Sequence, residues 1–160
     1  MATIRSQLDR QVSKGKLDEA ARDAALGRIR TTSDPAGIAR TDLVIEAATE
    51  NEALKLEILG KVEKLLAPET IIATNTSSIS ITRLAAGLSR PGKVVGMHFF
   101  NPVPVMALVE IIRGLRTDED TVATVTALAE RLGKTPIGVR NSAGFVVNRI
   151  LCPMINEAIF

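Results

Sequence analysis

Two kinds of hydrophobic pattern alternate along the chain. Short apolar runs bounded by turn residues predict buried strands, at 43–45, 71–73, 94–97, 108–112 and 136–139, with a further short strand expected at 29–32. Longer segments with apolar side chains at helical spacing predict helices, at 3–14, 17–29, 49–66, 80–88, 117–132 and from about 144 onward. Strands that alternate with helices predict an α/β fold built on a parallel sheet.

Turn and capping residues divide this pattern into elements. Thr49 and Glu52 form a capping-box pattern, with Thr49 as the expected N-cap of the helix that follows. The first two predicted helices turn at Gly15 and form an amphipathic hairpin that carries charges of both signs. The polar stretch at 140–144 predicts a domain junction, after which a new helix begins.

Composition and charge narrow the class of protein. The 160 residues carry a net charge of +2 and no block of Lys or Arg, so the sequence predicts no nucleic-acid surface. No apolar run reaches transmembrane length and no signal peptide opens the chain, so we expect a cytoplasmic protein without membrane contact. Cys152, the only cysteine, excludes an internal disulfide and gives no metal cluster. It follows an apolar run, which predicts a buried thiol.

The candidate chemistry centres on His98, the only histidine. It lies where the predicted strand 94–97 ends, and ligands of open α/β sheets bind at the carboxyl ends of strands. Imidazole also exchanges protons near neutral pH. Asn101 lies in the same loop, and Glu110 interrupts the next apolar run, where a carboxylate is costly to bury without a partner such as His98. Two alternatives stay open: a core histidine with no chemical role, and an edge-strand Glu110 that faces water.

Three blocks of sequence carry a resemblance to a known family. Residues 74–78 (TNTSS), 96–102 (GMHFFNP) and 144–149 (GFVVNR) resemble the signature blocks of 3-hydroxyacyl-CoA dehydrogenases, of the 3-hydroxybutyryl-CoA dehydrogenase type. That family joins an N-terminal dinucleotide-binding domain to a helical domain that dimerises. The resemblance implies that residues 1–140, with the hairpin at 3–29, are a partial NAD-binding domain. Residues 141–160 then begin the helical C-terminal dimerisation domain.

The glycines depart from the family pattern. The family opens with a strand, a G-x-G-x-x-G loop and a helix, whereas no two of the 11 glycines here lie two positions apart. We therefore expect a chain truncated at both ends, with a partial Rossmann-like, doubly wound sheet that lacks its first strands. In that sheet the strand at 43–45 becomes an edge.

The resemblance also implies a reaction and the residues that perform it. The reaction is the reversible NAD-dependent oxidation of the 3-hydroxyl of a 3-hydroxyacyl-CoA to a 3-oxoacyl-CoA, a step of fatty acid metabolism. His98 is the implied general base and Glu110 its carboxylate partner. The implied substrate-binding residues are Ser77, Asn101 and Asn148, and the implied cofactor-binding residues are Ala47, Glu50, Lys55 and Asn75. No metal is implied, and the complete family protein is a homodimer.

Several of these residues have plainer interpretations. Ser77 suits a strand-end turn, and Asn101 suits a loop-structuring role. Glu50 and Lys55 suit a first-turn charge and an exposed helix charge. An alternative for the whole chain is a non-catalytic fragment of the enzyme that does not bind NAD.

Overall fold

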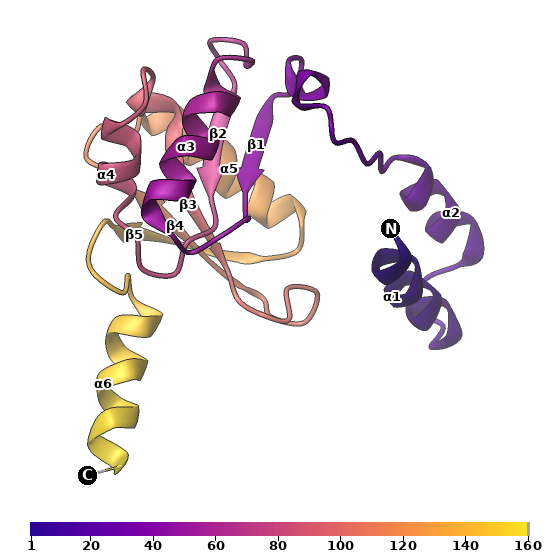
Figure 1. Ribbon diagram of the computed structural model, residues 1–160. Coiled ribbons are helices and arrows are strands. Elements are labelled where there is room, and N and C mark those ends of the chain that lie inside the picture. The colour runs from indigo at the N-terminus through magenta and orange to yellow at the C-terminus, as the bar shows by residue number, and fades with distance from the viewer. Residues whose placement is uncertain (160) are drawn as a thin grey trace. The chain divides into compact units, whose positions relative to one another are not determined.

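The structure, a computed structural model, describes residues 1–159 and divides into two compact units, Met1–Gly37 and the remainder from Ile38 onward. The first unit is a hairpin of two helices, α1 (Ala2–Ser13) and α2 (Glu19–Gly27) (Figure 1). Asp18 caps α2 by accepting a hydrogen bond from the backbone N–H of Ala21. Arg22 of α2 pairs with Asp9 of α1. The predicted helical hairpin is confirmed.

The segment 29–32 is not a strand. It is irregular and exposed, so this prediction is wrong. Only one of its four residues is apolar, and a strand needs a neighbour to pair its backbone groups. A short 3₁₀ helix, η1 (Pro35–Ile38), follows.

The second unit contains a five-stranded sheet in the order β1-β2-β3-β4-β5. The strands are β1 (Leu43–Glu46), β2 (Ile71–Thr74), β3 (Val94–Phe99), β4 (Leu108–Arg113) and β5 (Thr135–Arg140). All neighbours pair in parallel except β3 and β4, which are antiparallel. The expectation of a purely parallel sheet is therefore wrong at this one place. The loop between β3 and β4 is too short for a crossover helix, whereas antiparallel strands can be joined directly.

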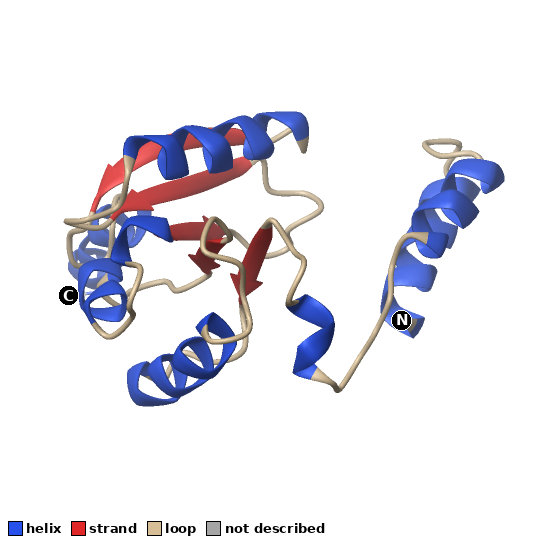
Figure 2. Cartoon of the chain, turned by 90° about the horizontal axis from the view of Figure 1, so that it is seen from above, coloured by secondary structure: helices blue, strands red, loops and turns tan. Residues whose placement is uncertain are grey.

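Helices cover both faces of the sheet (Figures 1 and 2). Leu59 of α3 (Glu52–Glu63) and Ile81 of α4 (Ile81–Ala86) pack with Ile72 and Ile112 on one face. Val125 of α5 (Glu119–Arg131) packs with the other face. This arrangement confirms the α/β class.

Local signals explain how two of these helices are placed. Asn51 caps α3, with its side chain accepting from the N–H of Leu54, so the predicted cap at Thr49 is wrong. The Thr49 hydroxyl instead accepts from the N–H of Asn51, which supports the cap itself. Gly96 lets α4 approach β3, because a Cβ there would lie 2.9 Å from Ile81 Cδ1 and 2.8 Å from Ile112 Cβ.

The strand β1 lies at the edge of the sheet, as predicted. Among the described residues it pairs only with β2, and Ile45 remains 42% exposed. An apolar side chain on an open edge is a site at which sheets associate.

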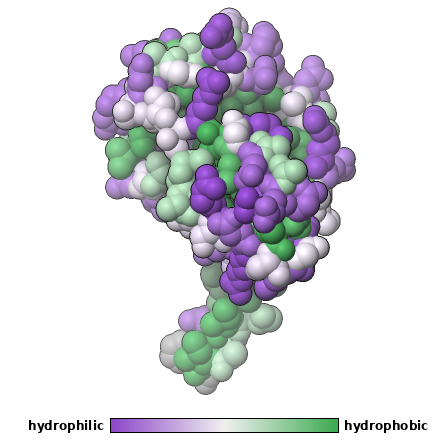
Figure 3. Space-filling view, turned by 90° about the vertical axis from the view of Figure 1, so that its right-hand side faces the viewer, coloured by the Kyte–Doolittle hydropathy of each residue, from purple (hydrophilic) through white to green (hydrophobic). Residues whose placement is uncertain are grey.

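The last helix, α6 (Val147–Ile159), has no buried residue. In Figure 3 it is the projection at the bottom of the view, and much of its surface is hydrophobic. Its exposed large hydrophobic residues include Ile150, Leu151, Met154, Ile155 and Ile159. Cys152 is also exposed, so the predicted buried thiol is wrong. The apolar run before it lies on a helix that no other described element covers. None of the described helices is both long and apolar enough to cross a bilayer.

Candidate functional site

A buried pair of polar side chains joins the two antiparallel strands. His98 of β3 and Glu110 of β4 face each other in register, and side chains opposite each other on a sheet are close neighbours. His98 Nδ1 lies 2.7 Å from Glu110 Oε2. Glu110 is 0% exposed and His98 is 5% exposed. The predicted contact is confirmed, and the alternative of a water-facing Glu110 is wrong, because β4 lies between β3 and β5.

The second oxygen of Glu110 binds the segment that begins α6. Its Oε1 accepts hydrogen bonds from the backbone N–H groups of Val146, at 2.9 Å, and Val147, at 3.0 Å. Three donors therefore surround a carboxylate that has no access to water, which is what a buried charge needs. Phe100 and Phe145 flank the imidazole of His98, with ring centroids 4.5 and 5.9 Å away.

Ser77 and Asn148, predicted on the substrate side, lie together. The Asn148 side-chain amide donates to the Ser77 carbonyl over 3.2 Å. With Ser78, Gly144 and Cys152 they line a groove of about 720 Å³. One residue links this groove to the His98–Glu110 pair: Asn148 lines the groove and directly follows Val146 and Val147, which bind Glu110.

Glu50 organises the loop that carries Ser77. Its Oε1 accepts hydrogen bonds from the Thr76 hydroxyl at 2.7 Å, the Ser77 N–H at 2.9 Å and the Ser78 hydroxyl at 3.2 Å. Burial works against its charge, but these hydrogen bonds and the charge of Lys55 outweigh burial and hold the pKa of Glu50 below its ordinary value.

A buried ion pair lies at the carboxyl end of β1. Glu46 Oε2 accepts from Lys55 Nζ at 2.6 Å and from the Thr74 hydroxyl at 2.7 Å, and Oε1 accepts from the Ala48 N–H at 2.7 Å. Lys55 is 0% exposed, so its interpretation as an exposed helix charge is wrong. Burial opposes the charge of Glu46, yet the hydrogen bonds and the Lys55 charge hold its pKa below the ordinary value. Glu46 is not among the predicted site residues, although a carboxylate that ends an apolar run was a usable signal.

The other predicted residues follow the carboxyl ends of β1, β2 and β3. Asn75 joins strand ends, since its Oδ1 accepts from the Phe99 N–H and its own N–H donates to the Glu46 carbonyl. Ala47 is exposed just after β1, and Asn101 is exposed in the loop after β3. Within residues 1–159, the side chain of Asn101 makes no hydrogen bond to His98 or Glu110, which bind each other.

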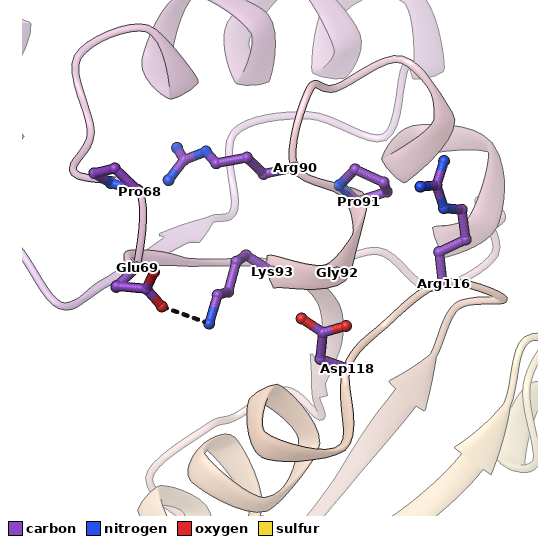
Figure 4. Close-up of a pocket in the computed structure, with 8 residues that line it drawn as sticks. All are labelled: Pro68, Glu69, Arg90, Pro91, Gly92, Lys93, Arg116 and Asp118. Atoms are coloured by element: carbon purple, nitrogen blue, oxygen red, sulfur yellow. Dashed lines mark ion pairs between the residues drawn. The ribbon is translucent and has the colours of Figure 1, made fainter.

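A further pocket, of about 580 Å³, lies beside the segments that precede β2 and β3 (Figure 4). Its cationic residues are largely matched by carboxylates: Lys93 pairs with Glu69 at 2.8 Å, and Arg90 lies 3.6 Å from Glu63. It contains no nucleophile or general base comparable to His98. Among the described residues, no cluster of His, Cys, Asp and Glu is suited to a metal ion.

Known proteins resemble this chain along nearly all of its length. Residues 1–142 match the NAD-binding domain of 3-hydroxyacyl-CoA dehydrogenase. A probable 3-hydroxybutyryl-CoA dehydrogenase of Bacillus subtilis is 48% identical over 98% of this chain and 55% of its own length. The fatty acid oxidation complex subunit alpha of Acinetobacter baumannii is 49% identical over 96% of this chain and 21% of its own length.

Among solved structures, an (S)-3-hydroxybutyryl-CoA dehydrogenase from Ralstonia eutropha superposes with a TM-score of 0.96 and 59% identity. The match covers 98% of this chain and 56% of that one. The chain thus spans about half the length of the dehydrogenases it matches. With its sheet, its paired His98 and Glu110 and a match over residues 1–142, the chain belongs to the 3-hydroxyacyl-CoA dehydrogenase family, in its NAD-binding domain.

Proposed function

We propose that this chain carries the proton-transfer residues of an NAD-dependent 3-hydroxyacyl-CoA dehydrogenase, which oxidises the 3-hydroxyl of an acyl-CoA to a ketone. The observation that carries the proposal is the buried pair of His98 and Glu110, 2.7 Å apart at the carboxyl end of β3. Removal of hydride from an alcohol carbon requires loss of the hydroxyl proton, and a base must lie within hydrogen-bond reach of that oxygen.

In this proposal each nitrogen of His98 has a separate task. The ionised Glu110 accepts a hydrogen bond from Nδ1–H, which leaves the lone pair of Nε2 to take the hydroxyl proton. The resulting imidazolium is then balanced by the carboxylate of Glu110, as in hydrolase triads. NAD, when bound, supplies the acceptor for the hydride that leaves C3. In the reverse direction the imidazolium returns the proton to the alkoxide oxygen.

The groove between the β2 loop and α6 is the proposed place of the substrate. Ser77 and Asn148 present a hydroxyl and an amide beside it, and these groups suit the C3 oxygen and the thioester carbonyl of an acyl-CoA. Asn101 is proposed to contact the substrate from the loop after β3. The exposed apolar side of α6 supports the proposal that this helix opens a helical dimerisation domain in the complete protein.

The residues of this chain fit one part of the cofactor. Ala47, Glu50 and Asn75 follow the carboxyl ends of β1 and β2, where a nicotinamide and its ribose approach such a sheet. Lys55 would act there through its contact with Glu46. The pyrophosphate needs backbone N–H groups at a glycine-rich turn and helix start, and no G-x-G occurs in this sequence. The fit is therefore to the nicotinamide side alone.

We expect the 160-residue chain to bind NAD more weakly than micromolar. The pyrophosphate contributes much of the binding through the missing turn, and its charge would remain unpaired here. Calorimetric titration of the chain with NAD tests this. A matched control is a chimera in which the chain replaces the equivalent 56% of the Ralstonia eutropha enzyme. Micromolar binding by the chain alone would contradict the expectation, and failure of the chimera to bind would favour the non-catalytic alternative.

We expect Glu110→Gln to lower kcat of the chimera by about 10–100-fold with little change in KM. Gln keeps the size and an acceptor oxygen, but it carries no charge to balance the imidazolium, and a hydrogen bond to a charged group is worth about 1.5–3 kcal/mol. Steady-state kinetics measure both constants. An unchanged kcat would show that Glu110 does not assist His98.

A further inference from the structure

The segment that begins α6 has an unusual backbone. Gly144 has φ of 71° and Phe145 has φ of 53°. Phe145 is buried in the core beside Ile112 and Val139, and a bulky residue in the left-handed region is a true outlier. Such strain persists only where the surrounding structure fixes it.

The two residues that follow this left-handed turn donate backbone hydrogen bonds to the carboxylate that pairs with His98. The next two residues, Val146 and Val147, both donate their N–H to Glu110 Oε1. The other oxygen of the same carboxylate holds His98 Nδ1. Glu110 therefore reaches its partner histidine from a position that depends on the start of α6.

We propose that Val146 and Val147 are positioning residues, whose backbone N–H groups orient Glu110 and, through it, the imidazole of His98. The side chains of both valines are dispensable for this role, because the donors belong to the main chain. The same segment continues into Asn148, which holds the Ser77 carbonyl. One turn of backbone thus binds both Glu110, the partner of His98, and the loop that carries Ser77. This positioning role rests on the proposed function only in that His98 is taken to act as a base in catalysis.

A single substitution removes one donor and leaves the helix start in place. Val147 is the first residue of α6, where proline is well tolerated because its fixed φ suits a first helical position. Val147→Pro deletes the N–H that binds Glu110. Val147→Ala is the matched control, since it removes the side chain and keeps that N–H.

The measurement is NMR of the imidazole in the 160-residue chain, where His98 is the only histidine and its signals are unambiguous. We expect wild type and Val147→Ala to share one downfield, slowly exchanging Nδ1 proton. In Val147→Pro this proton moves upfield and exchanges faster. In the chimera, we expect Val147→Pro to lower kcat about tenfold or more with KM little changed, the effect of one charge-assisted hydrogen bond. An imidazole signal identical in all three chains would overturn the proposal.

A second measurement covers the case in which Val147→Pro does not fold. In the wild-type chain the amide protons of Val146 and Val147 should be protected from exchange, and both should shift in Glu110→Gln. Freely exchanging amides would overturn the proposal without any variant at position 147. If the imidazole signal responds as expected but the chimera has no dehydrogenase activity, the positioning role stands and the proposed function fails.

Discussion

His98→Gln is expected to lower kcat of the chimera by about 10²–10⁴-fold, the usual contribution of general acid–base catalysis. Glutamine retains a hydrogen-bonding group of similar reach, but its amide does not take a proton at neutral pH. The binding groove contains Ser77 and Asn148 and is untouched, so KM should change much less than kcat. Steady-state oxidation of 3-hydroxybutyryl-CoA with NAD, followed by absorbance of the reduced nicotinamide, gives both constants.

Met97→Leu is the control for this substitution. Met97 neighbours His98 on β3, is fully buried and packs in the cluster on the opposite face of the sheet. A change between residues of similar volume perturbs the strand without altering the base. Near-normal turnover in His98→Gln would sink the assignment, and an equal loss in Met97→Leu would attribute the effect to the strand.

Lys55→Met is expected to lower the free energy of unfolding by about 3–5 kcal/mol. It removes the only cation that the structure shows on the buried Glu46 carboxylate, and an uncompensated buried charge is strongly destabilising. Urea unfolding of the chain and of the chimera, followed by circular dichroism, measures the loss. A loss below about 1 kcal/mol would contradict the expectation, because that is the range of an exposed pair.

Two variants separate the charge from the shape. Lys61→Met breaks the pair with Glu57 on the same helix, whose side chains are largely exposed, and should lower the free energy of unfolding far less than Lys55→Met. The double variant Glu46→Gln with Lys55→Met should recover most of the loss. It removes both charges, and the single carbonyl oxygen of Gln keeps the hydrogen bond from the Ala48 N–H. The Gln amide NH2 takes the place of Oε2 and donates to the Thr74 hydroxyl, which accepts as well as donates.

The same pair gives the stability a defined dependence on pH. The pKa of Glu46 is held below its ordinary value of 4.5 by hydrogen bonds that outweigh burial. The unfolded chain therefore takes up the proton at higher pH than the folded chain, so the stabilisation is complete above about pH 4.5 and is lost as the pH falls through the lowered value. The double variant should lose less stability over that range than the wild type.

The hydrophobic pattern was sufficient for most elements of the fold and for the central contact. A carboxylate inside an apolar run pointed to a buried partner, and the only histidine ends the preceding strand. The direction of β4 needed a different signal, the length of the loop after Phe99, which rules out a crossover. Asn51, and not Thr49, caps α3. Thr and Asn are both preferred N-cap residues, so the sequence alone does not distinguish them and the local backbone conformation determines which one caps the helix.

Burial of single side chains was harder to predict. Lys55 is polar and lies on a helix, yet it is fully buried and pairs with Glu46, which lies on β1 and outside the sequence pattern of α3. Cys152 shows the opposite case: an apolar run predicts burial only if another element covers it, and none of the described elements does. Propensity and periodicity report on one segment, whereas burial depends on its neighbours.

His98 and Glu110 lie only 12 positions apart, on two strands joined by one loop. Their alignment is thus a property of a single β-hairpin and depends on its register, because a slip by one residue would send Glu110 to the opposite face. Contacts of such short range close early and at small entropic cost during folding. Insertions after Asn101 that lengthen this loop without changing the register would preserve the alignment and leave Phe100, which flanks His98, in place.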